Sequence, residues 1–270
     1  MGLRSTRAVV SNTMRMSNSS KLVSLITEQY GLVKVMAKGA RRPQSRYGAA
    51  LEPVTLIDGI YYHRDNREIQ TLGSVELIEA FSRVKSDIRM LTTASCMVEA
   101  AQTVTMPEDP AAGTFMLLKE SLEDLERSTE KDVDKHLWRF MLKLVNAAGY
   151  QPVFDRCVVC GKKPMSERVF FSYSDGGLIC SCTSSGERYG FWISPGALMV
   201  MKSLLSARYD ELSRISIGPR QRAEIENAVL QFFSYHTGTS RPPRSLAFLR
   251  KLEAFEKENS LFSEKMKDEG

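Results

Sequence analysis

Residues 32–48 read LVKVMAKGARRPQSRYG, and they join a strand-length aliphatic run to a cationic loop. The run Leu32–Lys38 has the aliphatic and β-branched content of a strand. The loop from Lys38 to Gly48 then holds four cations and one aromatic residue within eleven residues, and its glycine and proline residues exclude a continuous helix. We therefore expect a strand that leads into a rigid, positively charged loop. Its residues of interest are Lys38, Arg41, Arg42, Arg46 and Tyr47.

The segment around this loop has the pattern of a small β-domain. Four further strand-length runs lie within residues 1–80, and short polar or glycine-containing turns separate them. Five short strands suit a small closed barrel, and the five-stranded OB barrel is the commonest version that binds nucleic acids. We predict an OB-type barrel over residues 1–80, in which the further strands are Ala8–Met14, Lys21–Thr27, Val54–Tyr62 and Ile69–Leu77.

Positive charge is concentrated in the same segment. Residues 1–50 contain nine Lys and Arg residues and one acid, Glu28, which gives a net charge of +8. Because the 270 residues carry a net +5, the other 220 carry −3. A basic N-terminal module on a nearly neutral body indicates a polyanionic partner for that module.

The rest of the chain, residues 81–270, has mainly the period of helices. Apolar stripes at helical spacing follow Ser86, with a break over Pro107–Gly113, and Gly149 can end the third stripe. Helical signals resume at Ser194-Pro195, an N-cap followed by proline at the first helical position, and a later apolar stripe ends near Gly238. We therefore predict an α+β protein with a helical domain over 81–270, interrupted by a non-helical insert over 155–192 that holds four cysteines.

The four late cysteines have a spacing that suits a metal ion. Cys157 and Cys160 form C-x2-C, nineteen residues follow, and Cys180 and Cys182 form C-x-C, with Thr183 where a second C-x2-C would place its cysteine. Two such pairs can surround one zinc ion tetrahedrally. A degenerate site with reduced thiols and a redox dithiol are the alternatives, although no βαβ pattern supports the latter. We favour structural zinc, and we expect the fifth cysteine, Cys96, to be a buried apolar residue.

No constellation in the sequence demands catalysis. There is no phosphate-binding glycine loop, and the histidines His63, His136 and His236 lie far apart. The acids of residues 120–134 alternate with lysine and arginine at helical distances, which favours a salt-bridged surface over a metal-nuclease site. We expect a binding protein, not an enzyme.

Targeting signals are equally sparse. No apolar run reaches the length of a membrane span, and the N-terminus lacks the apolar core of a secretion signal. Met1-Gly2 with Thr6 formally matches a myristoylation pattern, but Arg4 and Arg7 fit a basic binding surface equally well. Reduced cysteines at metal-ligand spacing suit a cytoplasmic protein with no membrane partner.

Four strings together resemble RecO, the bacterial recombination mediator family. They are YGLVKVMAKGARRPQSRYGAALEP (30–53), GYQPVFDRCVVCG (149–161), SPGAL (194–198) and SLAFL (245–249). They occur in the family's order and span nearly the whole chain. The resemblance implies an N-terminal OB domain, a helical domain and a four-cysteine zinc site whose ligands would be Cys157, Cys160, Cys180 and Cys182.

The resemblance also implies a function. Members of this family bind single- and double-stranded DNA, anneal complementary strands coated with single-strand-binding protein, and with RecR help to load RecA in recombinational repair of gaps. RecF is left open as a further partner, and the location would be cytoplasmic, at the nucleoid. By position, the candidate DNA contacts are Lys34, Lys38, Arg41, Arg42 and Arg46, to which we add Arg15, Lys21 and Tyr47.

Three points stay open at the level of sequence. Tyr47 either stacks a base or closes the barrel. The acidic tail of single-strand-binding protein needs an apolar pocket with a cationic rim on the helical body, for which Arg127, Lys131 and Arg139 are candidates by residue type alone. A zinc-bearing OB module that binds RNA or assists transcription is the alternative function.

Overall fold

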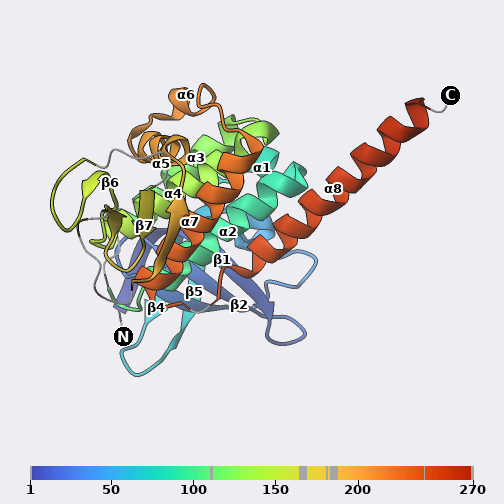
Figure 1. The fold of residues 1–270 in the computed structure, drawn as a ribbon. Coiled ribbons are helices and arrows are strands. Elements are labelled where there is room, and N and C mark those ends of the chain that lie inside the picture. The colour runs from blue at the N-terminus through green and yellow to red at the C-terminus, as the bar shows by residue number, and fades with distance from the viewer. Residues whose placement is uncertain are drawn as a thin grey trace.

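The computed structural model describes residues 2–109, 112–163, 169–180, 182, 188–239 and 241–268, with side chains described as far as residue 256. Five N-terminal strands form one closed sheet (Figure 1). They are β1 (Gly2–Arg15), β2 (Lys21–Thr27), β3 (Leu32–Ala37), β4 (Leu56–His63) and β5 (Ile69–Glu79). All five predicted strands are therefore confirmed, and the break at Pro107–Gly113 lies partly outside the described residues.

Hydrogen bonding runs around the ring in the order β1-β2-β3-β5-β4, and β4 returns to β1. The β3–β5 pair is parallel, and the other four pairs are antiparallel. β1 begins six residues earlier than predicted because Gly2–Arg7 pairs with Asp58–His63, a long-range contact that its own polar sequence does not announce. β4 begins later than predicted because Val54 adopts a positive φ of 56°.

The residues that follow β3 complete the interior of the barrel. Tyr47, Ala50 and Leu51 are buried in the same apolar cluster as the inward side chains of the strands. Ala50 and Leu51 lie in the short 3-10 helix η1 (Gly48–Leu51). Thus Tyr47, at the end of the predicted loop, and the η1 residues that follow it fill one end of the barrel interior.

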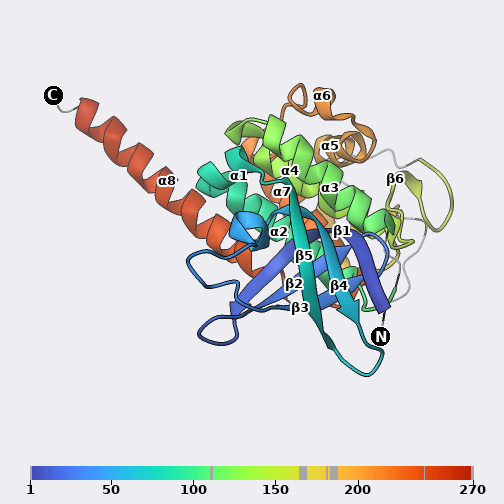
Figure 2. The same ribbon diagram turned by 180° about the vertical axis from the view of Figure 1, so that it is seen from behind.

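The helical body packs on one side of this barrel, as the two opposite views show (Figures 1 and 2). Its core includes barrel residues Val9, Ile26 and Leu56 together with side chains from most of the helices. The elements are α1 (Ser82–Ser86), α2 (Ile88–Val104), α3 (Ala112–Arg127), η2 (Glu130–Asp132), α4 (Val133–Ala147), α5 (Pro195–Ser206), α6 (Tyr209–Leu212), α7 (Pro219–Thr237) and α8 (Arg244–Asp268). Within the described residues no helix is long and apolar enough to cross a membrane.

Local signals fix several helix ends as expected. Ser194 Oγ accepts a hydrogen bond from the Ala197 N–H, at 3.3 Å, and Pro195 occupies the first position of α5. Gly238 ends α7 with a φ of 66°. The single-turn helix α1 was not predicted, because its N–H groups at Arg83 and Val84 are capped by Glu126 from a distant helix.

The insert is a small sheet packed on the body. Its strands β6 (Val153–Cys157), β7 (Val169–Ser172), β8 (Gly177–Ile179) and β9 (Gly190–Ile193) lie in the order β6-β8-β7-β9. Phe171 on β7 is fully buried, with its ring centroid 5.9 Å from that of Phe232 on α7. The prediction that this segment is non-helical is confirmed, but its four strands were not predicted.

Candidate functional site

The cationic loop, residues 38–48, lies beside the turn between β1 and β2 at one end of the barrel (Figure 2). Arg41 joins the two segments: its N–H donates to the Ser19 carbonyl oxygen, at 3.1 Å, and its Nη1 donates to the Ser17 carbonyl oxygen, at 2.8 Å. Turns within the loop are closed by the Arg42 N–H to the Gly39 oxygen and the Ser45 N–H to the Arg42 oxygen. The loop is therefore held at one end by the hairpin turn and at the other by Tyr47 and η1 in the barrel interior.

This arrangement brings most of the predicted DNA contacts together. The side chains of Lys38, Arg41, Arg42 and Arg46 are exposed on the loop, and Arg15 is exposed at the end of β1. Lys21 is half-buried, and it pairs in register with Arg15 on β1 and with Ala37 on β3. Because Lys38 directly follows Ala37, cationic residues lie side by side at the ends of three neighbouring strands. In the described part of the chain, Lys38, Arg42 and Arg15 form no ion pair, so their charges are available to an anionic partner.

Lys34 does not belong to this group. Its Nζ donates to Glu68 Oε1 at 2.5 Å, and it lines a hollow beside the β4–β5 turn with Arg4, His63 and Glu108. The lysine lowers the pKa of Glu68 by hydrogen bonding to its charged form. Lys34 is thus paired with an acid, unlike Arg15, Lys38 and Arg42 among the described residues, and it is a weaker candidate for a phosphate contact.

Tyr47 packs inside the barrel. Its side chain is 3% exposed, its hydroxyl donates to the Leu72 carbonyl oxygen at 3.4 Å, and the Arg46 guanidinium covers its ring at 5.0 Å. A base cannot stack on a ring that is covered on this side and buried on the other. Of the two roles left open, barrel closure is the one that this geometry supports, and the assignment of Tyr47 as a DNA contact is corrected.

The four late cysteines meet at one point, although they come from two separate parts of the insert. Their sulfur atoms all lie within 4.8 Å of one another, with Cys157 and Cys182 3.7 Å apart and Cys160 and Cys180 3.4 Å apart. Four thiolates around zinc, with Zn–S bonds of about 2.3 Å, lie about 3.8 Å from one another. The donor set and its spacing therefore fit a tetrahedral metal ion. Thr183 lies outside the described residues.

The backbone around the first pair favours thiolate chemistry. Gly161, with a φ of 73°, donates its N–H to the Cys157 oxygen at 2.9 Å and closes a tight turn around the first cysteine pair. Burial acts to raise the pKa of Cys157, but hydrogen bonds from the N–H groups of Cys180, Cys160 and Val159 outweigh it and lower the pKa to about 6. Hydrogen bonds that the protonated Cys182 thiol donates to neighbouring sulfurs, Cys180 first, raise the pKa of Cys182 to about 12. Four thiolates this close together would repel one another. A divalent cation bound between them would offset that repulsion.

The acid-rich stretch of α3, η2 and α4 is a network of ion pairs. Asp124 accepts from Arg127 at 2.8 Å and from Arg139 at 3.1 Å, and Lys135 contacts Asp132 at 2.7 Å. The predicted salt bridges are confirmed for these residues, but the prediction of a fully solvated surface is wrong for Asp124, which is buried. The fifth cysteine, Cys96, is buried as predicted, and burial raises the pKa of its thiol.

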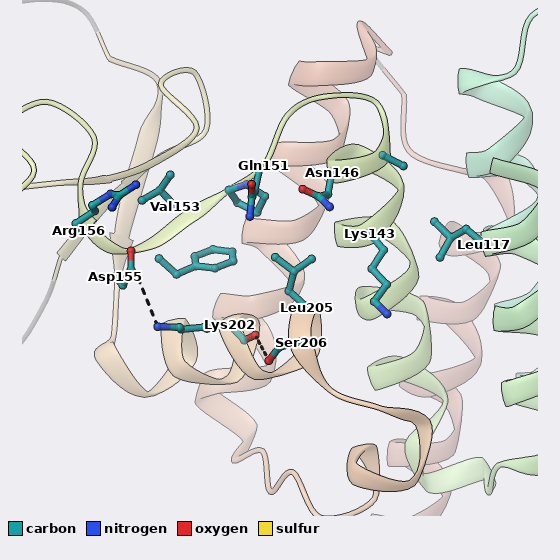
Figure 3. A pocket seen from close by; sticks show the side chains of 13 residues that line it. Leu117, Lys143, Asn146, Gln151, Val153, Asp155, Arg156, Lys202, Leu205 and Ser206 are labelled. Carbon is teal, nitrogen blue, oxygen red and sulfur yellow. Dashed lines mark hydrogen bonds and ion pairs between the residues drawn. The ribbon is translucent and has the colours of Figure 1, made fainter. Parts of the chain in front are cut away.

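A hollow of about 690 Å³ opens between α3, α4, β6 and α5 (Figure 3), and we call it the α3–α5 pocket. Leu117, Phe154 and Leu205 supply apolar lining, and Lys143, Arg156 and Lys202 supply cations. Lys202 lies 3.6 Å from Asp155, and burial lowers the pKa of Lys143. The candidates Arg127, Lys131 and Arg139 do not line it. No sequence pattern predicts this pocket, because its residues come from three separate parts of the chain.

Comparisons with known proteins identify the family of this chain. The family model described as "Recombination protein O N terminal" matches residues 1–81, and "Recombination protein O C terminal" matches residues 85–247. Among similar proteins, "DNA repair protein RecO" of Thermobifida fusca is 31% identical over 239 residues, 87% of this chain and 94% of that protein. Its namesakes from Desulfitobacterium hafniense (30% over 240 residues, 88% and 86%) and Caldanaerobacter subterraneus subsp. tengcongensis (29% over 231 residues, 86% and 92%) match over similar lengths. The chain therefore belongs to the RecO family of bacterial DNA repair proteins.

Proposed function

We propose that this protein binds single- and double-stranded DNA at the cationic end of its barrel and anneals complementary strands coated with single-strand-binding protein. With RecR, and with RecF as a further candidate partner, it promotes RecA loading in recombinational gap repair. The five-stranded ring supports an OB-type barrel over residues 1–80, followed by a helical domain over 81–270 with the insert 155–192.

The pinned cationic loop is the observation that carries this proposal. Annealing is opposed by repulsion between two anionic strands, and a protein lowers that barrier by neutralising phosphates while it leaves base edges free to pair. Arginine and lysine contacts to phosphate carry little sequence information, which suits a protein that must accept any sequence. Exposed cations held on a rigid loop meet this need without catalysis, and a protein with this role would act at the nucleoid in the cytoplasm.

A strand-annealing assay tests the proposal. Complementary DNA strands coated with single-strand-binding protein are mixed with wild type or with Lys38→Ala/Arg42→Ala, and Lys131→Ala/Arg214→Ala serves as the control with the same loss of charge. Both control residues are exposed on the helical body, away from the loop. The loop variant should anneal more slowly and the control should match wild type. Equal rates in all three proteins would reject the loop as the annealing surface, and a preference for structured RNA without annealing would support the RNA-binding alternative.

The cysteine cluster is proposed to hold one structural Zn²⁺ ion, with Cys157, Cys160, Cys180 and Cys182 as ligands. Zinc would supply cross-linking of the two ends of the insert rather than a reactive centre, because four protein ligands leave no open position. The thiolate-favouring backbone of Cys157 and the spacing of the sulfur atoms support this assignment.

The α3–α5 pocket is proposed to receive the acidic C-terminal tail of single-strand-binding protein. Its apolar side chains suit the apolar part of such a tail, and Lys143, Arg156 and Lys202 suit its carboxylates (Figure 3). Lys202→Glu places a carboxylate in the rim, and like charges brought together across an interface cost several kcal/mol, so peptide affinity should fall by more than about 10-fold. Fluorescence anisotropy with a labelled tail peptide measures this, with Lys131→Glu as the control. Equal affinities in the two variants would remove this pocket from the proposal.

A further inference from the structure

A row of aromatic rings on the insert and α7 has no part in the function described so far. Ring contacts connect Tyr189 to Tyr173, Tyr173 to Tyr235, Tyr235 to His236 and His236 to Tyr150, with successive centroids 6.4, 5.6, 5.2 and 4.5 Å apart. We call these five residues the aromatic ladder. Tyr189, Tyr235 and Tyr150 are 55%, 49% and 47% exposed, so the ladder is a surface feature and not part of the core.

Three residues of the ladder, Tyr173, Tyr189 and Tyr235, line a groove of about 570 Å³ between the insert and α7. Tyr173 and Tyr189 line the insert side. Asn227, Gln231 and Tyr235 line the helix side, and their spacing of four residues places them on one face of α7. Asn227 and Gln231 are exposed, and amide side chains both donate and accept hydrogen bonds. Flat rings beside such amides match the faces and edges of nucleobases.

A second hollow continues the groove toward the barrel. The two hollows share Pro242, and the second, of about 870 Å³, reaches Ser11 and Asn12 on β1. Figure 1 shows β1 below the end of α7 and the start of α8. Asn12 lies three residues before Arg15, at the cationic end of the barrel. The second hollow therefore lies between the groove and the β1 residues that precede the cationic end of the barrel, so a DNA strand bound at that end can extend toward the groove.

The charges along this path favour a polyanion. Arg241 and Arg244 line the second hollow and are exposed, and within the described residues neither guanidinium has an ion-pair partner. Arg250 lines the first hollow and pairs with Glu226. One acid, Glu99, is found among the described residues that line the two hollows, and its carboxylate accepts hydrogen bonds from the first turn of α8 at Arg244 and Ser245.

We propose that the aromatic ladder is a second binding site for single-stranded DNA, which stacks bases on Tyr189 and Tyr235 and is reached along Arg241 and Arg244 from the barrel. This inference rests on the proposed DNA-binding function and extends it. Phosphate contacts at the barrel hold the backbone, and ring contacts on the body hold unpaired bases in a sequence-tolerant way. A longer strand would thereby remain unstacked and presented for pairing.

Oligonucleotide length separates the two sites. Because one OB fold covers about 4–16 nucleotides, oligothymidylates of about 8 and about 30 nucleotides report the barrel alone and the barrel with the ladder. In Tyr189→Ala/Tyr235→Ala, affinity for the long strand should fall about 5-fold to 150-fold for each stacked base lost, and affinity for the short strand should stay at the wild-type value. Tyr189→Phe/Tyr235→Phe keeps both ring faces and should bind like wild type.

The outcomes distinguish this inference from the function on which it rests. Unchanged long-strand affinity in the alanine variant overturns the ladder and leaves the barrel site standing, and a ladder that served a protein partner would give this result. An equal loss for both lengths also overturns the ladder, since it indicates damage to the fold. If wild type binds neither length, both the ladder and the proposed function are rejected.

Discussion

The salt dependence of DNA binding can be worked out from the exposed charges at the end of the barrel. Arg15, Lys38, Arg41, Arg42 and Arg46 are exposed there. On single strands each neutralised phosphate contributes about −0.7 to the slope of log affinity against log salt, so five cations set a limit of about −3.5. Replacing two of them in Lys38→Gln/Arg42→Gln should reduce the slope to about −2.1.

Fluorescence anisotropy with a labelled oligothymidylate measures this slope. Between about 50 and about 200 mM salt, affinity should fall up to about 130-fold in wild type and about 18-fold in the variant. Neither Lys38 nor Arg42 has a side-chain partner in the described part of the chain, so the thermal unfolding temperature should not change. The control Lys131→Gln/Arg214→Gln should keep the wild-type slope. A variant slope equal to that of wild type would refute the assignment of phosphate contacts to this loop.

Three other variants test packing, metal and titration. Tyr47→Ala should lower the free energy of unfolding by about 3–5 kcal/mol, while Tyr47→Phe leaves single-strand affinity unchanged; weaker DNA binding by the stable Phe variant would count against pure packing. Cys160→Ser should abolish stoichiometric zinc by elemental analysis while Cys96→Ala retains it, and zinc-free wild type would contradict the centre. Burial lowers the pKa of His136 to about 4 in the folded state, compared with 6.5 in the unfolded chain. Because the unfolded chain then binds a proton that the folded protein does not, the free energy of unfolding decreases as the pH falls from 6.5 toward 4. His136→Gln should therefore remove about 2 kcal/mol of the stability loss between about pH 7 and pH 5 in denaturant titrations, and an unchanged loss would show that other groups cause it.

Local signals account for the parts of the fold that sequence predicted well. Short runs rich in aliphatic and β-branched residues, bounded by turns, identified the five strands, and Ser194, Pro195 and Gly238 marked helix ends through backbone hydrogen bonds that lie close in sequence. The cysteine spacing identified a cluster before its geometry was known, because only two short knuckles had to meet. These features depend on contacts between near neighbours, which a sequence records directly.

Features made by distant residues were not predictable in the same way. Tyr47 was ambiguous because the same ring can stack a base or fill a barrel, and its contact with Leu72 decides the matter. Lys34 looked like the other cations until Glu68, which follows the next strand, was found beside it. The strands of the insert and the α3–α5 pocket likewise arise from segments that meet only after folding.

The loop whose end is buried in the barrel also bears on the thermodynamics of recognition. Ordering each residue costs about 1–2 kcal/mol of backbone entropy. A disordered basic segment would lose that entropy whenever it bound DNA. Here Arg41, fixed to the hairpin turn, and Leu51, buried in the barrel, order the loop when the chain folds. Association with DNA should therefore be fast and show little loss of conformational entropy. An insertion in this loop would weaken the packing of the barrel interior and the binding of phosphate together.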